Sequence, residues 1–550
     1  MMRFQTDVLV IGAGGAACRA AIEAADCGAR VLMVSKKPLG NAGATCFPVA
    51  EMAGYNAGNP DVPGDIERHY EDIVSAGQGM VDPALAQLLA EQAPDTISRL
   101  IEWGVSFEME DGDFYIFKSC FSESARTHVI RGHGKPIIEA MTQQIKKRHK
   151  IQILDRVTIA GLLMDCERCA GAFGWDAEGK SFIIESGSVV LATGGTTQAF
   201  LRNMNPLDVT GDGYTIGHEA GAKLINMEFM QVGMCFSHPV INMFNAYLWE
   251  GMPRLYNGEN MEFLTNYLPE GLSSYDVMHE HRRHFPFSTS DASKYLEIAA
   301  HKEICNGRGT EHGGIVADLS HMTDSYIQSL EDDCGIHHMW PIARDYMLHK
   351  GVDLLKQKAE VAVFAHATSG GLVIDKSAST KIPGLFAAGE VAGGSHGANR
   401  LGGNMMVTCQ VFGAIAGKNA ALSALQNPVT KLDSQLVAKF VDRKKELLLR
   451  VIDTEGMILR LKECNQENLL INRSEVSLNF VLQMVDQLQK EINNAPLGNV
   501  INLRNFELYS LMYTSQIMAI SALQRKESRG SHHRVDYPEK NNLYNRAFVL

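Results

Sequence analysis

The 550-residue sequence predicts an α/β protein whose main domain is built in two parts, with a second domain inserted between them and a helical domain after them. Three observations carry this prediction. An apolar run at residues 7–11 stops at glycines and continues as a small-residue helix, which is how a doubly wound fold begins. A similar pattern returns at residues 361–420 after a stretch of weaker periodicity. Residues 431–526 then have the apolar spacing of a helical bundle.

The glycine turn at the start of the chain predicts a dinucleotide site. Gly12 permits a tight turn, Gly14 lets the backbone approach a pyrophosphate, and Ala17 is small enough for helix and strand to pack closely. The helix that follows offers free N–H groups and a positive dipole end to the anion. A second apolar strand follows at residues 30–34, the spacing that a dinucleotide-binding fold requires.

The segment after the second strand departs from the simple NAD pattern, because Ser35 and Lys36 stand where an acidic residue often binds the ribose. Residues 40–46 are small, so they form either a backbone that approaches a flat ring or a plain surface loop. Residues 64–104 have helical spacing. Within them, Asp82 is placed to cap a helix whose first residue is Pro83.

Residues 151–188 have the pattern of a β-meander with turns near Asp165 and Gly179. Cys166 and Cys169 lie on the first turn at a spacing that suits zinc or a redox pair. Because no second cysteine pair follows, we favour a hairpin turn with bystander cysteines and expect no metal.

The second half of the α/β domain offers two carboxylates to a ligand. Asp212 lies in a glycine-bounded turn, where it either accepts a ribityl hydroxyl or caps the next helix. Glu390 follows a buried strand at a second such position. The helix that begins near Asn404 points its positive end at whatever precedes it, which favours negative charge on a reduced flavin.

Domain boundaries follow from these changes of pattern. We expect residues 1–225 to form the first part of the main domain, 226–358 the inserted domain and 359–425 the second part. Residues 426–526 would form the helical domain and 527–550 a C-terminal extension. Because residues 527–538 are polar and irregular, we expect them to run over the surface.

Composition excludes several classes of function. The chain is 45% apolar and 21% charged, as in an ordinary soluble protein. A net charge of −12 does not indicate the excess of basic residues that binds nucleic acid. Eleven scattered cysteines indicate a reducing compartment. No apolar run reaches the roughly 20 residues that span a bilayer, and little precedes the first strand, so we expect a cytoplasmic protein without a membrane span.

Four blocks in a fixed order carry a resemblance to a known family. They are residues 12–17, 192–195, 389–404 and 527–538, and the most specific are His396–Gly402 and Ser528–Gly530. Together they resemble the flavoprotein subunits of the succinate dehydrogenase/fumarate reductase family, which includes L-aspartate oxidase and adenylylsulfate reductase. The resemblance implies a two-part Rossmann-like FAD-binding domain, an inserted α+β capping domain and a C-terminal helical domain.

The resemblance also implies where FAD is held. The expected contacts are Gly12, Ala13, Gly14, Gly15, Ala16, Ser35, Lys36, Gly43, Ala44, Thr45, Val157, Gly194, Asp212, Glu390, Asn404 and Met405. Many relatives attach FAD through a histidine in the segment after the second strand. The first histidine of this chain is His69, so we predict non-covalent FAD.

The implied chemistry is hydride transfer between flavin N5 and a carbon next to an activating carboxylate. Arg400 and His366 match the family's substrate-binding residues, although Arg400 could instead pair with a buried acid and His366 could cap a turn. Glu250 keeps the carboxylate of another family motif. The proton-donating arginine of the family falls on Ser290.

Three positions break the family pattern: Gly233 replaces a histidine, Trp249 a threonine and Ser290 an arginine. Each lost charge-assisted contact costs about 1.5–3 kcal/mol, whereas Trp249 would add a stackable apolar face. We therefore predict a substrate that is bulkier and less charged than fumarate, with one carboxylate or carbonyl near Arg400. Arg254, Arg282, Arg283 and His284 either compensate from nearby or belong to a solvated surface.

Our leading hypothesis is an FAD-dependent oxidoreductase that reduces or forms a polarised C=C bond in an unsaturated acid or a related compound. Since no cysteine cluster here could hold iron–sulfur centres, they would sit on a ferredoxin-like partner. One alternative is adenylylsulfate-reductase-like chemistry on a sulfur centre, with Trp249 stacked on an adenine. The other is a flavoprotein electron-transfer subunit without a substrate pocket.

Overall fold

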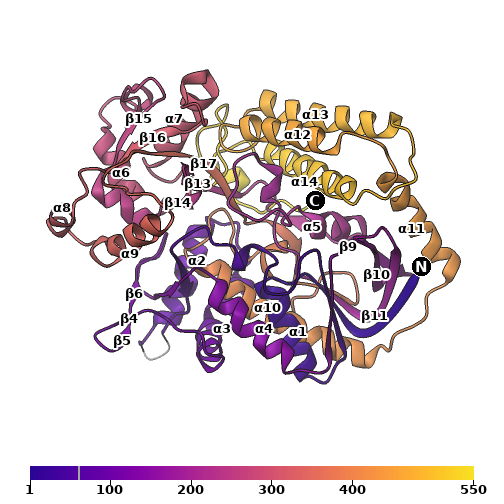
Figure 1. Cartoon of the computed structure of the whole chain (residues 1–550). Coiled ribbons are helices and arrows are strands. Elements are labelled where there is room, and N and C mark those ends of the chain that lie inside the picture. The colour runs from indigo at the N-terminus through magenta and orange to yellow at the C-terminus, as the bar shows by residue number, and fades with distance from the viewer. Residues whose placement is uncertain (60–61) are drawn as a thin grey trace.

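The computed structural model describes residues 1–59 and 62–550 and is organised around a seven-stranded sheet (Figure 1). The strand order is β8-β2-β1-β11-β10-β9, and β19 pairs with β11. The bounds are β1 Met2–Ile11, β2 Val31–Ser35, β8 Ile151–Asp155, β9 Val157–Asp165, β10 Arg168–Asp176, β11 Ser181–Leu191 and β19 Leu385–Ala387. The strands from β8 to β11 and β19 pair in parallel, as in a dinucleotide-binding fold.

Small residues let two helices pack closely beneath this sheet. Helix α1 (Gly15–Asp26) lies against α10 (Asn404–Gln426) from the far end of the chain. A side chain at Gly413 would lie 2.9 Å from the carbonyl oxygen of Ala16, and one at Gly417 only 2.1 Å from that of Ala20. The two halves of the main α/β domain therefore join through a backbone-to-backbone contact that larger residues would prevent.

The remaining helices and strands of this domain cover the sheet and build the cavity wall. They are η1 Ala44–Cys46, β3 Met52–Asn56, α2 Asp65–Gly77, α3 Pro83–Glu102, β4 Met109–Glu110, β5 Asp113–Phe114, β6 Ile116–Phe117, β7 Thr127–Arg131, α4 Lys135–Lys146, η2 Thr197–Ala199, α5 Asp212–Glu219, β12 Leu224–Ile225, β18 Gly371–Val373, η6 Gly389–Val391 and β20 Ala392–Gly393. The predicted cap of α3 is confirmed, since the Asp82 carboxylate accepts a hydrogen bond from the Ala84 N–H.

The predicted meander is only partly correct. β9, β10 and β11 pair antiparallel, but β8 leaves them and pairs in parallel with β2. The reason is that β8 follows α4 and completes a strand–helix–strand crossover at the sheet edge. The predicted hairpin turn is confirmed: Cys166 occupies the β9–β10 turn with φ 53°, and Cys169 is the second residue of β10.

The capping domain has its own five-stranded antiparallel sheet and apolar core. Its elements are β13 Met230–His238, β14 Asn242–Met243, η3 Ala246–Gly251, β15 Arg254–Tyr256, η4 Leu264–Tyr267, α6 Ser274–His281, α7 Lys294–Glu303, η5 Ile304–Arg308, β16 Ile315–Asp318, α8 Asp324–Gln328, α9 Ile336–His349 and β17 Ala359–Thr368. β17 pairs with β13, so residues assigned by sequence to the second FAD part complete the capping sheet.

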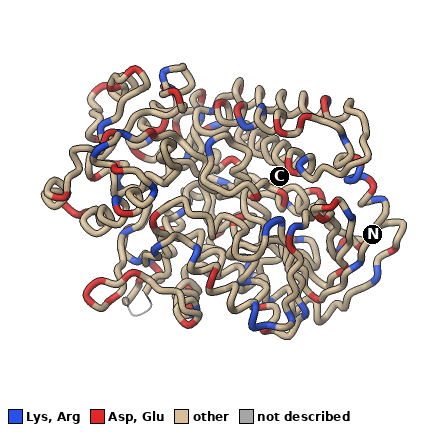
Figure 2. Tube along the Cα trace, in the orientation of Figure 1, with Lys and Arg blue, Asp and Glu red and all other residues tan. Residues whose placement is uncertain are grey.

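The C-terminal helices form the predicted bundle, drawn in orange and yellow in Figure 1. They are α11 Ser434–Leu448, α12 Thr454–Asn468, α13 Glu475–Asn494 and α14 Arg504–Gln524, followed by the short turn η7 Asn542–Tyr544. Within residues 1–59 and 62–550, no helix is long and apolar enough to cross a membrane. Figure 2 shows acidic and basic residues interspersed along the trace.

The expectation that the C-terminal extension runs over the surface is wrong for its first part. Arg525, Glu527, Arg529 and Arg534 are at most 1% exposed. The Glu527 carboxylate accepts hydrogen bonds from Arg525 and from Arg529, at 2.9 and 2.7 Å, and Arg525 also pairs with Glu228. Because residues 527–538 are polar, we expected water to solvate them, whereas their charged groups form ion pairs inside the protein.

Candidate active site

One cavity lies where the two parts of the main α/β domain meet the inserted domain. It contains about 2120 Å³ of empty space, open mouth included. Every predicted FAD contact lines this cavity except Asn404.

The glycine turn forms the phosphate end of the cavity. Gly12 has φ 126°, and a side chain there would lie 2.2 Å from the Ala192 carbonyl oxygen. Helix α1 begins after Gly14 without a side-chain cap, so the free N–H groups of its first turn remain available. Thr45 also reaches this turn, since its hydroxyl accepts from the Gly15 N–H at 3.3 Å. These features suit a pyrophosphate.

Lys36 is held by acids from two distant segments. Its ammonium group lies 2.6 Å from the Asp212 carboxylate and 2.8 Å from that of Glu507. Asp212 also accepts the Thr210 hydroxyl. Glu507 belongs to α14, so the helical domain helps to shape the cofactor cavity. No sequence pattern pointed to Glu507, because it is 471 residues from Lys36.

A second helix terminus lies at the other end of the cofactor region. Helix α10 starts after Gly403, again without a side-chain cap, and Met405 lines the cavity. Asn404 is fully buried behind the lining, where His69 contacts its Oδ1 at 3.1 Å. The Glu390 carboxylate accepts the Thr368 N–H at 2.8 Å, and burial raises its pKa to about 7. It can therefore accept a ligand hydroxyl at little electrostatic cost.

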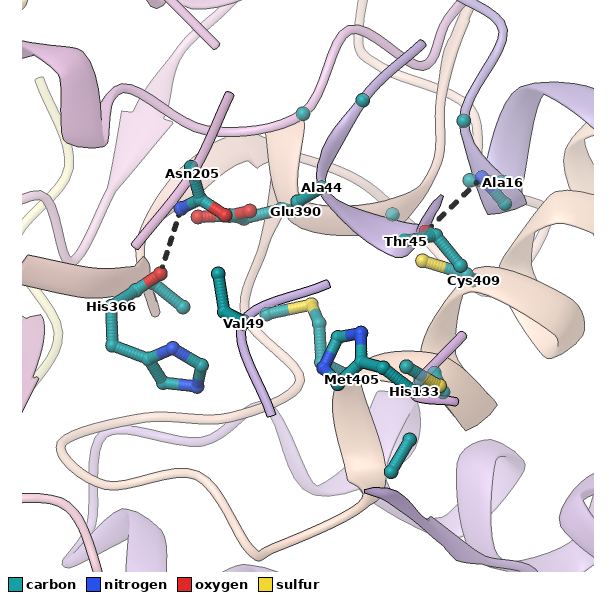
Figure 3. Close-up of a pocket in the computed structure, with 18 of the residues that line it drawn as sticks. Ala16, Ala44, Thr45, Val49, His133, Asn205, His366, Glu390, Met405 and Cys409 are labelled. Carbon is teal, nitrogen blue, oxygen red and sulfur yellow. Dashed lines mark hydrogen bonds between the residues drawn. The ribbon is translucent and has the colours of Figure 1, made fainter. Parts of the chain in front are cut away.

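His133 was not predicted from the sequence, yet it lines the cavity from the loop after β7 and lies near Met405 in the view of Figure 3. Burial lowers the pKa of His133 to about 4, so the ring is neutral, and its Nδ1 has no hydrogen-bond partner. Its only sequence signal is the pair of flanking glycines. Since His133 and His366 both face the cavity, non-covalent FAD stays a prediction.

Arg400 and His366 come together on the capping-domain side of the cavity. Arg400 donates to His366 Nε2 at 3.1 Å, to Gln231 Oε1 at 3.0 Å and to the Leu401 carbonyl at 2.9 Å. Burial and the charge of Arg400 lower the pKa of His366 to about 3, so this ring is neutral. Among the described residues Arg400 donates only to neutral acceptors and forms no ion pair, although it is only 6% exposed. A buried guanidinium without an acid calls for an anionic ligand.

The structure does not bring Glu250 and Ser290 into the cavity lining. Glu250 lies behind the wall, where its Oε1 accepts the Cys334 N–H at 3.0 Å and lies 3.9 Å from Arg282. Arg282 itself lines the cavity. Ser290 is exposed, and its hydroxyl accepts from Gln78 and Ser288 at 2.7 and 2.9 Å.

Comparisons with known proteins agree with this geometry. The FAD binding domain family matches residues 7–406, and the fumarate reductase flavoprotein C-terminal family matches residues 458–547. The chain belongs to the fumarate reductase/succinate dehydrogenase flavoprotein family. It is an FAD-dependent oxidoreductase.

Relatives of this flavoprotein cover its whole length. An uncharacterized FAD-dependent oxidoreductase of Methanocaldococcus jannaschii is 33% identical over 97% of this chain and 94% of the relative. One of the subunits of the fumarate reductase (CoM/CoB) from Methanothermobacter marburgensis is 32% identical over 100% of this chain and 97% of the relative. A variant of E. coli quinol fumarate reductase superposes with a TM-score of 0.82, at 25% identity, over 99% and 94% of the two chains.

The residues present fit FAD well. Two uncapped helix termini offer free N–H groups to its polar groups, and the close approach of Gly43 to Gly14 leaves the backbone of both segments open to it. The acids that could take ribityl or ribose hydroxyls, Glu390 and Asp212, both line the cavity.

One departure from the family pattern changes the cavity wall beside Arg400 and His366. A side chain at Gly233 would lie 2.7 Å from the Phe285 ring, so glycine there makes room for that ring. Phe285 lines the cavity and packs edge-on against His366, with 5.5 Å between ring centroids. An apolar ring therefore lies beside the Arg400–His366 pair.

The expectation that Trp249 offers a stackable face to the substrate is wrong. Trp249 is fully buried, packs against Phe244 and His281 with centroids 4.6 and 4.9 Å away, and does not line the cavity. The reason is that η3 directs it into the core of the capping domain. Trp249 therefore cannot stack on an adenine bound in the cavity, as the sulfur-centre hypothesis requires.

Proposed function

We propose that this flavoprotein interconverts a carbon–carbon double bond and its saturated form next to a carboxylate or carbonyl, in a substrate with one negative charge and an apolar body. The observation that carries this proposal is Arg400, a buried cation that faces the cavity without an acidic partner. Its planar fork matches the two oxygens of a carboxylate.

The chain's own residues bind and orient this substrate. Since Arg400 donates to His366 Nε2, the proton of the neutral ring is assigned to Nδ1, which can donate to a second substrate oxygen. When bound, FAD supplies the hydride acceptor or donor. Arg400 stabilises the negative charge that develops next to the carboxylate during the reaction.

The rest of the substrate end suits an apolar body. Apolar and sulfur-containing side chains dominate there, namely Val49, Met52, Phe117, Cys120, Met243, Ala246, Phe285 and Pro286. Of the cations that line this end, Arg282 pairs with Asp333 at 2.8 Å and Arg283 with Glu280 at 3.4 Å, and Arg254 does not line the cavity. A second carboxylate, as in fumarate, would therefore lack a free buried cation.

We further propose that electrons reach the flavin from an iron–sulfur partner. A relative is named as one of the subunits of a fumarate reductase, which supports assembly with other chains. Among the described residues, no cluster of histidine, cysteine and acidic side chains could hold a metal ion. A cytoplasmic location remains a prediction from the sequence.

Titrating the oxidised protein with acids while recording the flavin spectrum tests this proposal. Cinnamate, which has one carboxylate and an apolar ring, should perturb the spectrum with a Kd at least tenfold below that of fumarate. Tighter binding of fumarate would contradict the proposal, as would the absence of any response to enoates. A response to AMP alone would favour the sulfur-centre hypothesis instead.

A further inference from the structure

The start of α10 lies at the end of the cavity where the flavin has to meet the substrate. Arg400, whose buried guanidinium calls for an anionic ligand, shortly precedes this helix, and Met405 and Met406 of its first turn line the cavity. The flavin ring, rather than the pyrophosphate, therefore belongs at this helix terminus. The positive end of the helix dipole favours the negative charge that reduction brings to the ring.

The first turn of α10 has hydrogen-bond donors to spare. No side chain caps the helix, and within residues 1–59 and 62–550 the N–H groups of Met405 and Met406 have no acceptor. The Asn404 N–H is already used, since it donates to the Leu401 carbonyl at 3.3 Å. The reduction potential of the flavin therefore depends on whether the two free N–H groups stay available to it.

Asn404 carries an acceptor that competes for these donors. An asparagine side chain readily accepts a hydrogen bond from the backbone N–H two residues further on, which here belongs to Met406. Asn404 is fully buried, so bulk water does not satisfy its Oδ1. In the structure that oxygen instead meets His69 of α2, whose Nε2 lies 3.1 Å away.

His69 has the protonation state that this contact requires. Burial lowers its pKa to about 4, so the ring is neutral and has a single N–H. An amide oxygen can only accept, which assigns that proton to Nε2. The charged groups around the ring are Arg126, Asp65 and Asp72, and Arg126 pairs with both acids, at 3.2 and 2.5 Å. Because these charges pair with one another, the His69 N–H stays committed to Asn404.

We propose that His69 raises the reduction potential of the flavin by holding the Asn404 oxygen away from the first turn of α10. The N–H groups of Met405 and Met406 then remain free to stabilise the reduced ring. His69 does not line the cavity, so it is a positioning residue that acts through Asn404. The inference concerns the flavin alone and does not depend on which substrate the cavity accepts.

The test compares the flavin midpoint potential of FAD-loaded wild type, His69→Phe and His69→Gln, measured against reference dyes. His69→Phe keeps a ring but has no N–H, so the Asn404 oxygen should turn to Met406 and disfavour reduction at least tenfold. For a two-electron couple, tenfold corresponds to a potential about 30 mV lower. His69→Gln retains an N–H donor and should stay within threefold of wild type. The matched control is His149→Gln, at an exposed histidine of the same domain.

A double variant shows whether His69 acts through Asn404. Without the Asn404 side chain no oxygen competes for the donors of α10, so adding His69→Phe to Asn404→Ala should shift the reduction equilibrium by less than threefold. A purely structural role would instead shift it equally in both backgrounds. If the phenylalanine prevents folding, His69→Leu, which is smaller than the ring and also lacks an N–H, takes its place in both comparisons.

Three results would overturn the inference. The first is a reduction equilibrium of His69→Phe within threefold of wild type, and the second is an equal fall in His69→Gln. The third is the full effect of His69→Phe in the Asn404→Ala background. None of these results bears on the proposed reduction of enoates, which substrate titration tests separately.

Discussion

Arg400→Ala should lower kcat/KM for an enoate by roughly 30- to 5,000-fold. Removing one partner of a buried charge pair costs about 2–5 kcal/mol, and Arg400 has no neighbouring cation that shares its role. His366 cannot replace it, because burial and the adjacent guanidinium keep that ring neutral, with a pKa of about 3. Steady-state kinetics with cinnamate and reduced viologen give the ratio directly.

Two further variants define what Arg400 contributes. Arg400→Lys retains the charge but not the planar fork, so it should recover only part of the activity. Arg254→Ala removes an exposed arginine of β15 that does not line the cavity, and it should behave as wild type. Wild-type turnover by Arg400→Ala, with FAD bound and the fold intact, would favour an electron-transfer subunit.

Glu527→Ala should destabilise the protein by about 3–5 kcal/mol, the usual cost of leaving a buried charge unpaired. The Glu527 carboxylate accepts four hydrogen bonds, from Arg525, twice from Arg529 and from the Asn541 N–H. Without it, Arg529 retains only neutral acceptors. The onset of thermal unfolding should fall by several degrees, as followed by circular dichroism with FAD in excess.

The same network predicts how stability depends on pH. Burial raises the pKa of Glu527, but hydrogen bonds from Arg529 outweigh it, and the net pKa lies below the ordinary 4.5. A carboxyl group whose pKa is lowered on folding stabilises the protein above pH 4.5 and loses that effect as the pH falls further. Glu539→Ala, at an exposed site in the same extension, should leave stability unchanged. Equal stability of the two variants would contradict the network.

The cofactor region could be predicted because backbone geometry demands particular residues there. Gly12 is required by a positive φ and by the nearby Ala192 carbonyl, and such requirements leave a local pattern in the sequence. The strand and helix periodicities likewise located the sheet, the bundle and the capped start of α3. β8 was misplaced because apolar patterning does not say which neighbour a strand pairs with.

The contacts that the sequence did not reveal are those between distant segments. Glu507 pairs with Lys36, and His133 lines the cavity, from segments that carry no motif. Arg282 meets Glu250 across 32 positions of the sequence. Trp249 was predicted to face the substrate, but a short turn directs it into the core. The burial of the first part of the C-terminal extension was missed because the sequence does not distinguish charges that pair inside the protein from charges that water solvates.

We propose that the cavity accepts an acid with one charge and an apolar body. The most direct test is the ratio of kcat/KM for cinnamate to that for fumarate, measured on the wild-type enzyme with reduced viologen at pH 6.5. One free buried cation and an apolar wall predict a ratio of at least ten. A ratio below one, with fumarate reduced efficiently, would show that the cavity binds a second carboxylate and would contradict the claim.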